Sequence, residues 1–294
     1  MKILLIVLTV IGAALADTSK WTDFHVKYSP LSTGVGVNSF WTIHKRLVDA
    51  LIDGYVALDV ENSLGNQIIT LCYKTDHRVC PLYDSQGTIA GMMLAVPPAD
   101  VEGHGIPYDF NDHPVFEKKT IENVVYWTST YYLVDPKVIV AGGRPNDVEL
   151  IGEGLWLKSG SGFTQVPTDL KSIQDNTPYT WQNCIPNMGI HYYYNMTQNL
   201  RCEDFEPYFL LVKDDNIVGL GWQFNGRTTP VLRNYYDAID GNAVRTTVPL
   251  GPTCLSAGAD TYGVISIHMY FVEKPWAIPC KQSTDSVVPI PGLP

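Results

Sequence analysis

Most of this 294-residue chain is divided into short runs of β-branched and aromatic residues, each bounded by residues that favour turns. The 24 glycines and 20 prolines follow no Gly-X-Y period, which excludes a collagen-like chain and disfavours long helices. Hydrophobic residues make up 45% of the chain, enough to bury a core. The sequence therefore predicts a mainly β protein, with strands over 67–73, 88–96, 124–134, 137–141, 208–213, 217–224 and 262–273.

Two other local patterns stand beside these strands. Apolar residues at helical spacing run from Phe40 to Leu51, with Ser39 as a possible cap and Gly54 as a possible end, which predicts one helix. Residues 155–166 predict a hairpin, because two strand-like runs flank a turn that contains glycine.

A weak internal repeat organises the strands. Residues 80–92 and 207–220 each contain a strand, a polar turn and an Ile-x-Gly step, and residues 131–136 match 270–275 in the same order. We therefore expect two similar β modules, sandwich or barrel-like, that disulfides stabilise, with one or few helices. Chance similarity between hairpins is the alternative, since hairpins share turn chemistry. The expected boundaries are 17–150 for the first module, 151–180 for a connecting hairpin region, 181–281 for the second module and 282–294 for a flexible tail.

The first sixteen residues have the features of a signal peptide. Lys2 supplies a positive start, an apolar run follows to Leu15, and small residues at Ala14 and Ala16 fit a cleavage site before Asp17. This run is shorter than the roughly 20 residues that cross a bilayer, and no later segment approaches that length. We expect a secreted, extracellular protein without a membrane span.

The cysteine count agrees with secretion. The chain has six cysteines, an even number that predicts three disulfides in an oxidising environment. Their spacing permits fifteen pairings, of which sequential pairing closes the shortest loops, and no C-x-x-C motif supports a redox or zinc site. Asn195 begins an Asn-Met-Thr sequon, so we expect a glycoprotein with this residue at the surface. The expected disulfide residues are Cys72, Cys80, Cys184, Cys202, Cys254 and Cys280.

The charge balance narrows the partners. Thirty acidic residues against twenty basic ones leave a net charge of −10, and no basic stripe collects along the chain. A phosphate-binding surface has the opposite sign, so nucleic acid is excluded as an expected partner.

Two histidines have the same local setting. His191 and His268 each stand two residues before an aromatic residue, Tyr193 and Tyr270, so that in a strand each imidazole shares a face with a ring. If their strands are neighbours, the two imidazoles could share a pocket as metal ligands or as a catalytic acid and base. The alternative is a pair of half-buried histidines that bond to backbone carbonyls, because two ligands alone make an incomplete metal site.

A second histidine-bearing segment is the loop 102–113. It carries His104, Asp109, Asp112 and His113 among glycine and proline, a composition that can wrap a cation with oxygen and imidazole ligands. A solvated polar loop is the alternative, since no fixed ligand spacing is present.

The sequence favours binding over catalysis without identifying a ligand or cofactor. Nucleophile-elbow and phosphate-loop motifs are missing from it, and paired carboxylates for glycoside hydrolysis stay open because nothing singles out a pair. Consecutive tyrosines such as 192–194 place rings on both faces of a strand, where one face can meet a ligand. The leading hypothesis is a secreted protein that binds a small apolar or carbohydrate ligand, or acts in an extracellular assembly. The alternative is a secreted hydrolytic or oxidative enzyme with His191 and His268 at its centre.

Overall fold

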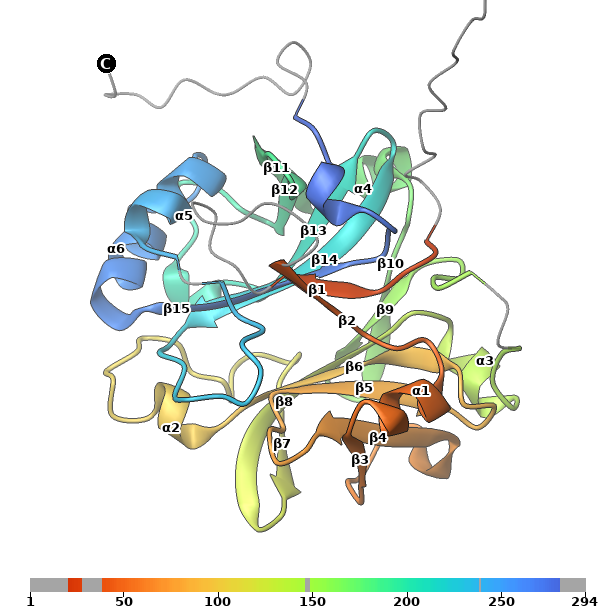
Figure 1. Ribbon diagram of the computed structural model, residues 1–294. Helices are drawn as coiled ribbons and strands as arrows, with labels where there is room; N and C mark the ends of the chain where they lie inside the picture. Colours follow the sequence, from red (N-terminus) through yellow and green to blue (C-terminus); the bar gives the residue numbers. More distant parts are fainter. Residues whose placement is uncertain (1–20, 28–38, 146–148, 238, 281–294) are drawn as a thin grey trace, which may run out of the picture.

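Two antiparallel β-sheets form the two layers of the molecule in a computed structural model, which describes residues 21–27, 39–145, 149–237 and 239–280 (Figure 1). One sheet has seven strands and the other has eight. The prediction of a mainly β fold with few helices and three disulfides is confirmed. The predicted leader 1–16 and tail 282–294 lie outside the described residues.

Neighbouring strands in each sheet are hydrogen-bonded in a defined order. Across the seven-stranded sheet this order is β11 (Tyr179–Ile185), β12 (Gly189–Tyr194), β13 (Tyr208–Lys213), β14 (Asn216–Asn225), β15 (Val264–Tyr270), β1 (His25–Lys27) and β2 (Phe40–Thr42). Across the eight-stranded sheet it is β3 (Tyr55–Leu58), β4 (Ile68–Tyr73), β5 (Val79–Asp84), β6 (Ile89–Val96), β8 (Val124–Tyr132), β9 (Leu155–Ser159) and β10 (Gly162–Val166), and β7 (Glu117–Ile121) pairs with β8.

The helices are short and cover the ends and outer faces of the sheets (Figure 1). They are α1 (Leu47–Ile52), α2 (Pro98–Val101), α3 (Pro136–Val140), α4 (Leu170–Asn176), α5 (Gly241–Thr247) and α6 (Thr253–Tyr262), with 3₁₀ turns η2 (Gly65–Gln67), η3 (Cys202–Asp204) and η4 (Pro275–Ala277). No helix in the described part of the chain is long and apolar enough to cross a membrane.

In each sheet, the two strands at one edge come from outside the predicted module to which the other strands belong. The N-terminal strands β1 and β2 join the seven-stranded sheet beside β15, close to the other end of the chain (Figure 1). In the eight-stranded sheet the same places beside β8 are taken by β9 and β10, the hairpin predicted over 155–166. Residues 151–180, predicted to connect two modules, therefore include two strands of the eight-stranded sheet.

The central strands of both sheets pair in the same register. Gly91 on β6 lies opposite Tyr132 on β8, and Gly219 on β14 lies opposite Tyr270 on β15. The hairpins β5–β6 and β13–β14 each contain a register shift, directly after Leu82 in the first and Leu211 in the second. The two sheets thus place corresponding strands in corresponding positions.

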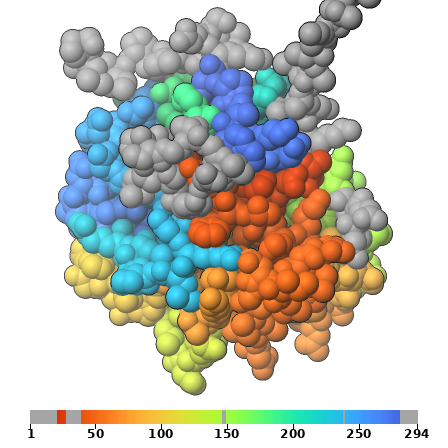
Figure 2. Space-filling model, in the orientation of Figure 1, coloured from red at the N-terminus to blue at the C-terminus, as the bar shows by residue number. Residues whose placement is uncertain are grey.

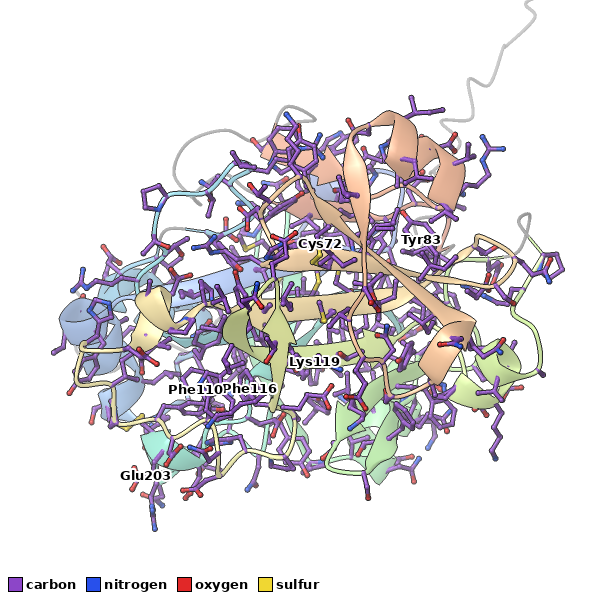
Figure 3. All side chains as sticks on the ribbon, turned by 90° about the horizontal axis from the view of Figure 1, so that it is seen from below. Cys72, Tyr83, Phe110, Phe116, Lys119 and Glu203 are labelled. Atoms are coloured by element: carbon purple, nitrogen blue, oxygen red, sulfur yellow. A yellow bond between two sulfur atoms is a disulfide. The ribbon has the colours of Figure 1, made fainter. Side chains whose placement is uncertain are left out.

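The core lies between the two sheets. The Tyr131 hydroxyl donates to Met269 Sδ at 3.1 Å, and the Ser129 hydroxyl donates to the Tyr208 hydroxyl at 2.8 Å. Figure 3 shows Phe110 and Phe116 together near one end of this core, where their ring centroids are 4.8 Å apart. The buried aromatic residues thereby join elements from both sheets into one apolar cluster.

Two local predictions differ from the structure. The helix predicted over 40–51 begins only at Leu47, because Ile43 N donates to Phe24 O at 2.8 Å and residues 40–42 form β2. The strand predicted over 137–141 lies mostly in the helix α3, since the Asp135 side chain caps Lys137 N and Pro136 fits the first turn.

The three disulfides use one sequential pair and two long-range pairs. Cys72 joins Cys80 across the start of the β4–β5 hairpin, and these sulfurs lie on the eight-stranded sheet (Figure 3). The other bonds join Cys184 to Cys280 and Cys202 to Cys254. The long-range bonds therefore tie β11 to the residues after η4, and η3 to α6.

The matched glycines are expected to tolerate no side chain. A Cβ atom at Gly91 would lie 2.2 Å from Tyr131 O, and one at Gly219 would lie 2.4 Å from Met269 O. Because backbone oxygens in a central ladder cannot move aside, Gly91→Ala should lower the free energy of unfolding by about 2–3 kcal/mol in urea denaturation. Gly162→Ala is the control, since its nearest neighbour is 4.0 Å away; an equal loss in both variants would contradict the prediction.

Candidate functional site

The two predicted histidines converge on the seven-stranded sheet. His191 Nε2 on β12 lies 3.4 Å from His268 Nε2 on β15. Both side chains are buried, and His191 has no exposed surface. The structure therefore brings together two residues that are 77 positions apart in the chain.

Two strands, β13 and β14, separate these histidines. Three strand spacings amount to about 14 Å, so the imidazoles can meet only above the strands between them. Gly221 on β14 leaves that space open, and the Phe209 ring on β13 fills it. Phe209 stacks on His191 with centroids 5.5 Å apart and meets His268 edge-on at 5.2 Å. The Phe209 ring therefore packs against both imidazoles, in the space that Gly221 leaves free.

Asp237 connects the pair to a buried lysine. His268 Nδ1 lies 2.6 Å from Asp237 Oδ2, and Lys27 Nζ donates to Asp237 Oδ1 at 2.9 Å. Lys27 lies opposite His268 because β1 pairs with β15, and Asp237 is held beside both by its backbone bond to Ser266 O. The carboxylate has no exposed side-chain surface. Lys27, Asp237, His268 and His191, which we call the histidine chain, form a continuous polar array in the interior.

The sequence did not point to Lys27 or Asp237. Lys27 ends a three-residue strand that is otherwise recognisable only by the apolar Val26, and Asp237 lies outside the named strands, between β14 and α5. A lysine among residues that pack inward was the one available signal, since a buried ammonium needs a partner of opposite charge.

Burial sets the protonation of His191. Desolvation, followed by the nearby charge of His268, lowers the pKa of His191 to about 3. His191 is therefore neutral at physiological pH. A carboxylate at Nδ1 holds His268 in one orientation, as carboxylates do for metal-bound and catalytic histidines. With Asp237 beside Nδ1, the other ring nitrogen of His268, Nε2, faces Nε2 of His191.

The Nε2 atoms of His191 and His268 are two possible ligands for a metal ion. Bonds of 2.0–2.1 Å to a tetrahedral ion place two ligand nitrogens about 3.4 Å apart, which equals the Nε2 separation. Two nitrogens leave such an ion short of ligands. Within the described ranges, no group of three or more His, Cys, Asp or Glu side chains is arranged to hold a metal.

In the loop predicted to wrap a cation, His113 and Asp109 make contacts with other protein groups. His113 stacks on Tyr108 with centroids 4.0 Å apart, and its Nε2 lies 2.7 Å from Glu203 O. Asp109 accepts hydrogen bonds from Asn111, while Asp112 is exposed and His104 is half-buried. The structure does not bring His104, Asp109, Asp112 and His113 together as one ligand set.

A separate cluster surrounds Arg233. Its guanidinium lies 3.6 Å from the centroid of Tyr73 and within 6 Å of Trp41 and Tyr55, and it donates to both oxygens of Asp53. The segment 226–237, which carries Arg233, lies at the surface beside the residues around β2 and α1 (Figure 2). This cluster, which we call the arginine cage, joins the seven-stranded sheet's loop to the eight-stranded sheet.

Three hollows on the described surface are relevant to binding. One of about 870 Å³ lies along 226–243 and reaches Asp237. Another of about 470 Å³ lies between α4 and the strands β11, β12 and β13. The third, of about 250 Å³, lies between β9–β10 and the strands β11–β12.

Comparison with models of protein families, with curated proteins and with solved structures found no match for this chain.

The buried ion pair should be costly to break. Asp237→Asn removes the carboxylate that lies 2.9 Å from the buried ammonium of Lys27, so we expect the free energy of unfolding to fall by about 3–5 kcal/mol. Asp175→Asn is the matched control, because Asp175 pairs with Lys171 at the surface, where such a change costs less than about 1 kcal/mol. Equal effects in guanidinium unfolding would contradict the buried pairing.

His191 should make stability depend on pH. The pKa of His191 is lower in the folded protein than in the unfolded chain. Its contribution to stability is therefore fully present when the pH is above the pKa of the unfolded chain, and it is lost as the pH falls towards about 3. Between pH 7 and pH 5 this one group should account for about 2 kcal/mol of lost stability. His191→Gln should remove that part of the decline in denaturation measured across this pH range. Parallel curves for the two proteins would show that His191 does not titrate as expected.

Proposed function

We propose that this protein acts outside the cell by binding a neutral carbohydrate in the hollow between α4 and β11–β13, which we call the Trp181 groove. The observation that carries the proposal is the combination, in one groove, of a half-buried indole with exposed amide and carboxylate side chains. Sugar rings stack their C–H faces on flat aromatic surfaces and offer hydroxyls to polar groups around them.

Three elements build the groove. Trp181 on β11 lies opposite Tyr192 on β12, so both rings share one face of the sheet. Gln174 on α4 donates to the Tyr192 hydroxyl at 3.4 Å, and Asp215 stands at the β13–β14 turn. The disulfide between Cys184 and Cys280 holds the end of β11 near Pro279, which also lines the groove. A rigid wall of this kind lowers the entropic cost of binding.

Size and charge favour a small neutral sugar. A volume of about 470 Å³ lies within the range of small-ligand sites. The net charge of −10 and the aspartates at the groove disfavour an acidic ligand. A purely apolar ligand would cover the exposed side chains of Gln174 and Asp215 without replacing their contacts with water.

The burial of the histidine chain supports binding over catalysis at His191 and His268. His191 has no exposed surface, and its lowered pKa makes it a weak base. The Phe209 ring also packs against both imidazoles. An enzyme centred on these residues stays the alternative hypothesis.

Secretion, glycosylation and an internal repeat belong to the same proposal. Three disulfides with no free cysteine in the described chain support an oxidising route. Asn195 is exposed and follows β12 directly, which supports its use as a sugar acceptor. The shared strand order and register of the two sheets support two related halves.

Tryptophan fluorescence tests the carbohydrate proposal. Titration of the purified protein with maltose, cellobiose and N,N′-diacetylchitobiose should quench or shift the emission with saturation for at least one sugar, because the indole of Trp181 would stack on the ring. Trp181→Ala should abolish the saturable change and weaken binding by at least about tenfold in calorimetry.

Trp156→Ala provides the matched control, since Trp156 is a half-buried indole on β9 that does not line the Trp181 groove. It should bind sugar as the wild-type protein does. No saturable response to any of the sugars, or unchanged binding in Trp181→Ala, would overturn the proposal, and a response to decanoate alone would favour an apolar ligand.

A further inference from the structure

The arginine cage shows how this fold holds a cation. Tyr55 on β3 and Tyr73 on β4 lie opposite each other, with ring centroids 5.4 Å apart and planes at 67°. The Arg233 guanidinium rests on the Tyr73 ring, donates to the Tyr55 hydroxyl at 3.3 Å and pairs with Asp53. Aromatic faces and a carboxylate are the groups that bind guanidinium and quaternary ammonium ions.

The other sheet carries the same pair of tyrosines. Tyr179 on β11 and Tyr194 on β12 lie opposite each other, with centroids also 5.4 Å apart and planes at 87°. β3 and β11 hold the same place, because each forms the edge of its sheet and is followed inward by four strands in the same order. The pair Tyr179–Tyr194 is therefore the positional counterpart of Tyr55–Tyr73.

The counterpart site lacks an arginine and is open. Trp41 of the arginine cage lies opposite Val26 in β1–β2, and the equivalent position in β9–β10 is Thr164, opposite Leu157. Thr164 is much smaller than Trp41, and Pro114 and Val115 line the site in place of a cation. A hollow of about 250 Å³ remains beside the two tyrosines, and we call it the Tyr194 pocket.

A carboxylate lines the Tyr194 pocket without a partner. Glu206 is half-buried, and among the described residues its side chain forms no hydrogen bond and no ion pair. Burial raises its pKa to about 7. Buried carboxylates normally have partners, since an unpaired one is costly to the fold. Asp53 provides the arginine cage with the same kind of group, and there it is paired.

We propose that the Tyr194 pocket binds a small organic cation, an alkylguanidinium or quaternary ammonium group, between the tyrosine rings and the Glu206 carboxylate. The bound cation takes the position that Arg233 takes in the arginine cage. Binding supplies the counter-charge that Glu206 lacks and covers the exposed face of Tyr194. The site is separate from the Trp181 groove and does not depend on the proposed carbohydrate function.

Affinity for the cation should rise with pH. Only the ionised form of Glu206 attracts a cation, so binding should strengthen about tenfold from pH 6 to pH 8. The neighbouring phenols of Tyr108, Tyr179 and Tyr208 have raised pKa values because of burial and stay neutral in this range. Desolvation lowers the pKa of His113, which stacks on Tyr108, and so disfavours its charged form. Glu206 is thus the group whose ionisation should set the pH profile.

Calorimetry and NMR titration with three probes test the proposal on the full-length protein. The probes are choline, methylguanidinium, and 3,3-dimethyl-1-butanol, which has the shape of choline without its charge. The neutral probe should bind at least about tenfold more weakly than the better of the two cations. The ratio of choline to methylguanidinium affinity then distinguishes a quaternary ammonium ligand from a guanidinium ligand.

Variants assign the binding to this pocket. Glu206→Gln should weaken cation binding at least about tenfold and remove its pH dependence, while raising the thermal unfolding midpoint at pH 8 because a costly buried charge is gone. This rise also shows that the variant is folded. Tyr194→Ala should weaken binding severalfold, whereas Glu203→Gln, an exposed glutamate nearby in the chain, and Trp181→Ala should bind cations as the wild-type protein does.

Three results would overturn the proposal. They are equal binding of choline and its neutral analogue, unchanged cation affinity in Glu206→Gln, and no saturable binding of either cation. Loss of sugar binding in Trp181→Ala with intact cation binding would leave this proposal standing, so failure at one site is distinguishable from failure at the other.

Discussion

The pairing of β1 with β15 is the contact on which both the fold and its polar interior depend. It adds the N-terminal strands to the seven-stranded sheet and so places Lys27 directly opposite His268. Without this pairing, Asp237 Oδ2 would still face His268, but Asp237 Oδ1 would lose the hydrogen bond that Lys27 Nζ donates to it. A single antiparallel ladder therefore determines the sheet's extent and the charge balance of the histidine chain.

That charge balance determines what the histidine chain can do. Lys27 and Asp237 are groups of opposite charge 2.9 Å apart, and burial holds His191 neutral. Polar chains of this kind fix one arrangement of the surrounding side chains when every member has a partner. Phe209 and Gly221 complete the arrangement. The Phe209 ring packs directly over Gly221, and any side chain at position 221 would collide with it.

The sequence predicted features that depend on neighbours along the chain. Strand runs, the 155–166 hairpin and the shared setting of His191 and His268 follow from period and turn chemistry, which are local. The partners Lys27 and Asp237 were missed because they meet across 210 positions, and nothing local marks either one. The sequence did not determine the disulfide pairing for the same reason, since Cys184 and Cys280 are 96 residues apart. The helix expected from Phe40 was shortened by a long-range ladder that its periodicity could not reveal.

The likeness of the two sheets explains why similar clusters differ in use. Tyr55–Tyr73 and Tyr179–Tyr194 have the same spacing, yet the segment after the central strands brings the Arg233 cation to the first pair and the apolar Pro114 and Val115 to the second. Small differences in loop sequence, such as Arg233 against Pro114 and Val115, thus change a filled contact into a cavity. The two sheets share strand order and register, and they differ here in the loops and in the residue at one edge position, Trp41 or Thr164.

The place of β1 and β2 has a consequence for biosynthesis. These strands are translated early, but their partner β15 is translated near the end, so the seven-stranded sheet cannot close while the chain is still being made. The eight-stranded sheet can assemble first, because all its strands precede α4. Until β15 has been synthesised, β1 and β2 lack the strand with which they pair, and unpaired strand edges of this kind favour misassembly.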